Sequence, residues 1–146
     1  MKGLAVDSSI TKLTIAAKND DHTVTASYDI GMKQSETLLP AIGYVLEKAG
    51  LTPMDLEYTA ICQGPGSFTG LRLGYAAVKA LECAAKAPVY GISTLKANAY
   101  AFENLGLPVV SVIDAKKERF YACAYKNGAE LFEEGDYSYE KLAALI

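Results

Sequence analysis

The sequence has little of what several common kinds of functional site require. Its three cysteines, Cys62, Cys83 and Cys123, lie far apart and include no C-x-x-C pair. Neither a disulfide framework nor a cysteine zinc site is therefore expected. The single histidine, His22, falls in a strand-like segment without ligands at metal-site spacing. We expect no metal site and no Ser-His-Asp triad, and we predict that His22 is a surface residue.

Charge and long apolar segments are also scarce. Charged residues make up 21% of the 146 residues, and the formal net charge is −3. A broad nucleic-acid surface needs a basic stripe, so direct binding of RNA is not expected. No apolar run approaches transmembrane length, and Asp7 lies too close to the start for a signal peptide. With 51% hydrophobic residues, the chain is expected to be a soluble cytoplasmic protein with a real core and no membrane contact.

The most distinctive segment is ICQGPGSFTGLRL, residues 61–73. An apolar run at 58–62 predicts a buried strand, and Gly64-Pro65-Gly66 predicts a sharp turn after it. Ser67 or Thr69 is suited to cap a helix that extends to about residue 85. This geometry favours either of two functions. The loop could hold an anion on free N–H groups, or it could let a helix with small side chains approach a neighbour closely.

The anion interpretation has weak support from spacing. Gly64-x-Gly66-x-x-x-Gly70 is not the dinucleotide pattern, no Walker lysine follows, and Arg72 is the only nearby cation. The close-packing interpretation rests on one helical face of mostly small residues, which comprises Gly70, Gly74, Ala77, Leu81 and Ala84. This face could pack on the protein's own sheet or on a partner, and the spacing leaves both possibilities open.

The hydrophobic periodicity predicts the element order β-β-β-α-β-α-β-α for residues 1–107. The predicted strands are residues 3–6, 12–18, 22–30, 58–62 and 88–92, and the predicted helices are residues 35–49, 67–85 and 93–104. Ser35 or Thr37 is expected to cap the first helix, Gly50 to end it, and Pro40 to lie near its first turn. The β-α-β portions predict a mixed sheet with flanking helices.

A second series of elements begins after Pro108. We predict strands at residues 109–113, 119–125 and 129–132, with a hairpin turn at Asn127-Gly128, and a helix at 138–146 capped by Ser138. Asp7 and Asp114 each follow the first strand of their series. The sequence thus predicts a first domain at residues 1–107 and an incomplete second copy of it at 108–146.

Four motifs together resemble the bacterial TsaB (YeaZ) family of the actin, sugar-kinase and Hsp70 superfamily. They are LAVDSS (residues 4–9), QSETLLP (34–40), GPGSFTGLR (64–72) and VIDAKKERFY (112–121). The chain departs from the family's usual residues at Gln34, where His is common, and at Lys116, where Arg is common. The resemblance implies an actin-like (ribonuclease H-like) fold.

The resemblance also implies a function. Members of this family are non-catalytic scaffold or activator subunits in the formation of threonylcarbamoyladenosine beside the tRNA anticodon. They pair with a TsaD-like paralogue and a TsaE-like ATPase, often form homodimers in isolation, and involve tRNA only indirectly. The alternative that remains is a nucleotide-binding kinase-like or glycoprotease-like enzyme. The resemblance implies no catalytic residue, cofactor or metal, and the weak candidates for nucleotide contact are Asp7, Ser8 and Asp114.

In this family the two helices of the first domain supply the dimer contact. The partner interface expected on that basis comprises Leu38, Ile42, Val45, Ser67, Phe68, Gly70, Leu71, Gly74, Ala77, Val78 and Leu81. The resemblance therefore favours the interpretation in which the small-residue helical face packs against a partner.

Overall fold

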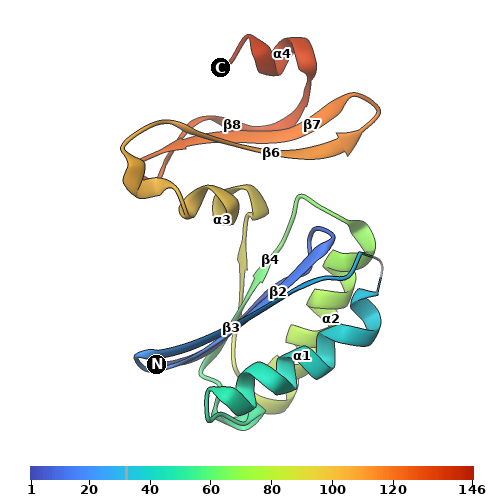
Figure 1. Ribbon diagram of the computed structural model, residues 1–146, viewed down its shortest axis with the longest axis vertical. Helices are drawn as coiled ribbons and strands as arrows, with labels where there is room; N and C mark the ends of the chain where they lie inside the picture. Colours follow the sequence, from blue (N-terminus) through green and yellow to red (C-terminus); the bar gives the residue numbers. More distant parts are fainter. Residues whose placement is uncertain (32) are drawn as a thin grey trace. The chain divides into compact units, whose positions relative to one another are not determined.

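The computed structural model describes residues 1–31 and 33–146, which form two compact units, Met1–Ile92 and Ser93–Ile146 (Figure 1). The first unit contains β1 (Lys2–Asp7), β2 (Lys12–Asn19), β3 (His22–Asp29), α1 (Gln34–Lys48), the 3₁₀ turn η1 (Pro53–Asp55), β4 (Tyr58–Cys62), α2 (Phe68–Ala85) and β5 (Val89–Ile92). Its sheet has the order β3-β2-β1-β4-β5. β2 pairs antiparallel with both β1 and β3, whereas β4 pairs parallel with both β1 and β5. The predicted mixed sheet with flanking helices, of the actin-like type, is therefore confirmed.

The core of the first unit lies between the sheet and the two helices. Alternate residues of β1 and β2 are buried, because successive side chains of a strand point to opposite faces; they include Leu4, Val6, Leu13 and Ile15. α1 and α2 contact each other and lie on the same side of the sheet (Figure 1). Their core-facing residues are Leu38, Ala41, Ile42, Val45, Leu46, Ala77 and Val78.

The capping of α1 and the place of Pro40 differ from the prediction. The helix begins at Gln34, and its N-cap, Lys33, makes no side-chain capping bond. The predicted caps at Ser35 or Thr37 are therefore wrong: Thr37 Oγ1 instead donates to the carbonyl of Lys33 at 3.1 Å. Pro40, which was expected near the first turn, lies inside the helix as its seventh residue, where it is exposed and cannot donate the usual backbone hydrogen bond. The predicted end is confirmed, because Gly50 follows the last turn with φ of +69°.

The second unit is a three-stranded antiparallel sheet with two helices packed against it. It comprises α3 (Thr94–Tyr100), the 3₁₀ turn η2 (Glu103–Leu105), β6 (Val109–Lys116), β7 (Arg119–Lys126), β8 (Ala129–Ser138) and α4 (Tyr139–Ala143), with strand order β6-β7-β8. Leu95 and Ala99 of α3 pack against Cys123 and Tyr125 of β7. The predicted Ser138 cap is confirmed, because its hydroxyl accepts from the amide of Lys141 at 3.3 Å; Ser93 caps α3 in the same way by accepting from the amide of Lys96 at 3.3 Å.

The second unit differs from the sequence-based expectation in extent. α3 is grouped with this unit, whereas the sequence analysis placed its residues in the first domain, before a boundary after residue 107. β8 continues to Ser138, beyond the predicted end at residue 132, and α4 ends at Ala143. The order β6-β7-β8-α4 repeats the order β1-β2-β3-α1, and the interpretation of this unit as an incomplete second copy stays a prediction.

Candidate functional site

The glycine segment between β4 and α2 lies against the turn that follows β1. The amide of Ser67 donates to the carbonyl of Ser9 at 2.6 Å. A Cβ atom at Gly66 would overlap that same carbonyl, so the two backbones meet without room for a side chain. Ser67 caps α2, since its hydroxyl accepts from the amide of Gly70 at 3.3 Å. The loop is thus joined to the first strand of its own unit.

The first turns of α2 continue this close approach. Cβ atoms at Gly70 and Gly74 would overlap the carbonyl and the hydroxyl of Ser8, respectively. Ser8 is fully buried, and its hydroxyl donates to the carbonyl of Gly70 at 2.8 Å. The small-residue face of α2 therefore packs on the unit's own first strand and its turn, which is the internal alternative that the spacing left open.

The hollow at the start of α2 is where the anion interpretation would place its ligand. A hollow of about 50 Å³ lies beside the start of α2, and its lining residues are Ile10, Thr11, Gly31, Gln34, Ser67, Thr69, Gly70 and Leu73. No charged side chain is among these lining residues. The amide of Ser67 already donates to Ser9, and the side-chain amide of Gln34 donates to the carbonyl of Ile10. The described hollow thus offers neither a cation nor the Ser67 N–H group to an anion.

The weak candidates for nucleotide contact are engaged in local turns. Asp7 Oδ1 accepts from the amide of Ser9 at 3.0 Å and from its hydroxyl at 2.5 Å. Asp114 Oδ1 accepts from the amide of Lys116 at 2.7 Å, and its Oδ2 lies 3.1 Å from the ammonium of the same lysine. The backbone bond, followed by the side-chain bond, lowers the pKa of Asp114 below its usual value. Asp7 thus stabilises the turn after β1, whereas Asp114 stabilises the bulged end of β6.

Most of the predicted interface residues lie inside the first unit. The buried ones are Leu38, Ile42, Val45, Gly70, Gly74, Ala77 and Val78. Leu71 and Leu81 are half-buried, and Ser67 and Phe68 are exposed. Because the buried residues already contact their own sheet and helices, they are not available to a partner in this fold. Of the predicted interface residues, Phe68 is the large apolar side chain that is exposed to solvent, with 73% of its surface accessible.

The outward faces of α1 and α2 carry further exposed apolar residues that the sequence analysis did not single out. Leu39 is 65% exposed and Tyr44 is 49% exposed, and both point away from the core stripe of α1. The Arg72 guanidinium lies 5.0 Å from the centroid of the Phe68 ring. We name the following exposed residues the outer helix surface: Leu39, Pro40, Gly43, Tyr44, Phe68, Arg72, Ala76 and Ala80.

A signal for this surface was present in the sequence. The core stripe of α1 occupies positions 38, 41, 42, 45 and 46, so a large apolar residue at 39 or 44 falls outside it. Single exposed apolar residues are common on protein surfaces, however, and carry little information by themselves. The positions become informative when α1 and α2 are placed side by side, and this placement requires the structure.

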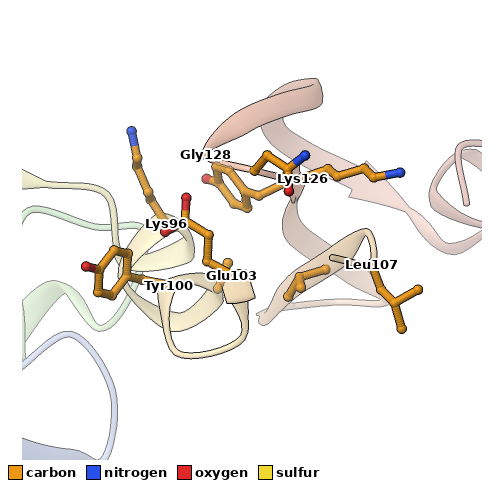
Figure 2. Close-up of a pocket in the computed structure, with 10 residues that line it drawn as sticks. Lys96, Tyr100, Glu103, Leu107, Lys126 and Gly128 are labelled. Carbon is orange, nitrogen blue, oxygen red and sulfur yellow. The ribbon is translucent and has the colours of Figure 1, made fainter. Parts of the chain in front are cut away.

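The second unit has a groove beside α3 (Figure 2). It is lined by Lys96, Ala99, Tyr100, Glu103, Leu107, Val109, Tyr125, Lys126, Asn127 and Gly128. Burial, followed by the neighbouring Cys123, raises the pKa of the Tyr125 hydroxyl well above its usual value, so this ring is neutral at physiological pH. None of these residues was predicted as a site from the sequence.

Residues 1–31 and 33–146 form neither a metal-binding cluster nor a membrane-spanning helix. No group of three or more His, Cys, Asp or Glu side chains is arranged there to hold a metal ion. His22 is exposed at the start of β3, as predicted. None of the helices formed by these residues combines the length and apolar character needed to cross a bilayer.

Comparison with known proteins places the chain in a family. A family model described as TsaD, tRNA N6-adenosine threonylcarbamoyltransferase, matches residues 30–146. The tRNA threonylcarbamoyladenosine biosynthesis protein TsaB of Bacillus subtilis is 34% identical over 132 residues, which cover 86% of this chain and 56% of the relative. TsaB of Escherichia coli is 30% identical over 149 aligned residues, which cover 100% of this chain and 62% of the relative.

A solved structure agrees with these relatives. YeaZ from Pseudomonas aeruginosa superposes with a TM-score of 0.81 at 26% identity, over 93% of this chain and 66% of that one. The chain spans 56% and 62% of the length of the Bacillus and Escherichia relatives, respectively. The match to the family model, the relatives and the shared fold together show that the chain belongs to the TsaB (YeaZ) family.

Proposed function

We propose that the chain is a non-catalytic interaction subunit in the formation of threonylcarbamoyladenosine in tRNA. Its outer helix surface binds a TsaD-type partner, and in isolation the same surface holds two copies together. A TsaE-type ATPase completes the assembly, and tRNA is contacted only indirectly. The Bacillus and Escherichia relatives are named as tRNA threonylcarbamoyladenosine biosynthesis proteins, which supports this reaction.

The observation that carries the proposal is the exposure of large apolar side chains on two adjacent helices. Leu39, Tyr44 and Phe68 are 65%, 49% and 73% exposed, respectively. The same two helices also expose Gly43, Ala76 and Ala80, which are small enough for a partner helix to approach. An aromatic ring that is buried on association is the kind of residue that dominates binding energy. Apolar residues that gather on one surface are typical of interaction sites.

The engagement of the candidate aspartates supports a role without catalysis. The Asp7 carboxylate is bonded to Ser9 and the Asp114 carboxylate to Lys116, so each has a structural function in its own turn. A kinase-like or glycoprotease-like enzyme would need a nucleophile, a base or a metal-binding carboxylate directed at substrate. The contacts of Asp7 and Asp114 do not favour such an enzyme.

A reconstituted modification reaction tests the proposal. The reaction contains unmodified tRNA, the threonylcarbamoyl donor, the TsaD-type partner and the TsaE-type ATPase, and mass spectrometry of the digested tRNA measures threonylcarbamoyladenosine. We expect the product to form with the chain and to fall at least tenfold without it. Phe68→Glu should lower the affinity for the partner by about 30-fold, because loss of an interface anchor costs about 2 kcal/mol or more.

The Asp7→Asn and Asp114→Asn variants separate the two candidate functions. An asparagine Oδ1 can still accept the amide bond of each turn, so both variants should support the reaction as well as the original chain does. A loss of product in either variant, with the partner still bound, would contradict the non-catalytic role. Full product formation with Phe68→Glu at sub-saturating concentration would contradict the proposed surface.

A further inference from the structure

The groove of the second unit has apolar walls that are open to solvent. Its cavity volume is about 30 Å³, and the wider space of about 330 Å³ around it is continuous with solvent. We name it the α3–β7 groove, after two of the elements that line it. Tyr100 and Leu107 are 73% and 65% exposed at its edges, while Tyr125 is almost fully buried. Exposed apolar side chains that border a recess suit the insertion of an apolar group.

The charged residues of the groove have a defined pattern. Lys96 and Lys126 extend on opposite sides of it, and Glu103 lies between them (Figure 2). The ion pairs found among the described residues are formed by other side chains, so these two ammonium groups and this carboxylate have no counter-ion there. The groove therefore presents an apolar centre with one acceptor and two flanking cations.

We propose that the α3–β7 groove binds an extended peptide segment of a partner protein. One apolar side chain of the peptide enters the groove, and a carboxylate on each side of it reaches Lys96 or Lys126. Glu103 accepts a hydrogen bond from a backbone N–H of the peptide near the apolar side chain. This charge complementarity fixes the position of the peptide along the groove, whereas the apolar contact contributes binding affinity.

The same pattern disfavours RNA as the occupant. A nucleic-acid strand would bring phosphates past Glu103, and the net charge of −3 provides no wider attraction for a polyanion. The groove lies entirely in the second unit and shares no residue with the outer helix surface. The inference therefore goes beyond the proposed function and can fail without affecting it.

A nuclear magnetic resonance titration tests the inference, because it detects binding even at millimolar dissociation constants. The probe is a heptapeptide with a central leucine and a glutamate two residues away on each side. We expect saturable shifts of the amide signals of Ala99, Tyr100, Asn127 and Gly128. Peptides with serine in place of leucine, or lysine in place of both glutamates, should bind at least about tenfold more weakly.

Charge reversal provides the matched control. The Lys96→Glu/Lys126→Glu variant should bind the acidic peptide about tenfold more weakly and should gain affinity for the lysine peptide, since both ion pairs are inverted. Lys12→Glu/Lys18→Glu changes the net charge equally at exposed positions of β2 and should leave binding unchanged. Binding that ignores these reversals would overturn the inference.

Two further results would identify a different occupant and thereby overturn it. An octauridylate that shifts the groove signals when the acidic peptide does not would assign the groove to RNA. Groove shifts that grow with protein concentration alone would assign it to a second copy of the chain. Leu107→Ser removes an exposed apolar wall, so the fold should persist, and unchanged peptide affinity would contradict the apolar contact.

Discussion

Gly74 lies in the middle of α2, where glycine is unfavourable for helix stability. The cost has a local cause, because a Cβ atom there would overlap the Ser8 hydroxyl and lie 2.9 Å from Ile61 Cδ1. The Ser8 hydroxyl is itself bonded to the Gly70 carbonyl, so it cannot move without breaking a buried hydrogen bond. Gly74 is therefore required for the packing of α2 on β1 and β4.

Two glycine-to-alanine substitutions test this requirement. Gly74→Ala should lower the free energy of unfolding by about 1–3 kcal/mol, the usual cost of overpacking. Gly43→Ala in α1 is the control, and both substitutions are made in the Leu39→Glu/Phe68→Glu background because Gly43 belongs to the outer helix surface; in the single chain no atom lies within 4 Å of the added methyl group. There the higher helix propensity of alanine should raise the free energy of unfolding by about 0.5–1 kcal/mol. Denaturant titration measures both, and a neutral Gly74→Ala would contradict the packing argument.

The sequence revealed the small-residue face but not its neighbour. Gly70, Gly74 and Ala77 recur at helical spacing. That spacing is the same whether the helix packs on its own sheet or on another molecule. Only the position of Ser8, more than sixty residues away in the sequence, decides between them. The sequence also could not show that Phe68 and Leu39 lie on a shared surface, because a single exposed apolar residue forms no periodic pattern.

At the scale of elements, two tight turns with different residues connect the strands of the second unit. Lys126 pairs with Ala129 across Asn127-Gly128, and Lys116 pairs with Arg119 across Lys117-Glu118. Both turns have positive φ at their two central residues: +51° and +78° in the first, +53° and +59° in the second. The Asn-Gly turn suits this backbone, whereas Lys-Glu carries a steric cost. Turn chemistry therefore predicted the β7–β8 hairpin directly but gave no such signal for the β6–β7 turn.

The strain at the β6–β7 turn is measurable. Glu118→Gly should raise the free energy of unfolding of the second unit by about 1 kcal/mol, because glycine adopts positive φ without steric cost. Gly128→Ala should lower it by about 1 kcal/mol or more, since the backbone has φ of +78° and the new methyl group would lie 3.0 Å from Glu103 Oε1. Denaturant titration followed by circular dichroism compares the two. A destabilising Glu118→Gly would show that the charged side chain matters more than the turn.

Elements of the first unit were more predictable than those of the second. In the first unit, strand alternation and the helical stripes each lead to one arrangement, and the bounds agree within about a residue; the caps predicted for α1 were wrong. In the second unit, the residues of β8 beyond Phe132 include Gly135 and two adjacent acidic residues, which do not resemble a strand. Pairing with β7 orders them: Phe120 pairs with Tyr137 and Arg119 with Ser138. Tertiary pairing overrode the local preference there.

At the scale of the whole molecule, the chain consists of two units with separate hydrophobic cores. The core of the first unit holds α1 and α2 so that their outward faces present Leu39, Tyr44 and Phe68 to solvent. The proposed function depends on this surface, whereas the glycines that first indicated close packing serve the interior. A fold of this type supports many functions, so the surface residues, not the fold, carry the functional argument.

Sedimentation velocity of the isolated chain tests the central claim most directly. The Leu39→Glu/Phe68→Glu variant is compared with Met54→Glu, which places a charge on a residue of η1 that is 67% exposed and outside the outer helix surface. We predict that the original chain and Met54→Glu sediment as dimers and that the double variant sediments as a folded monomer. A double variant that keeps its native circular dichroism spectrum and remains dimeric would contradict the claim that the outer helix surface is the interface.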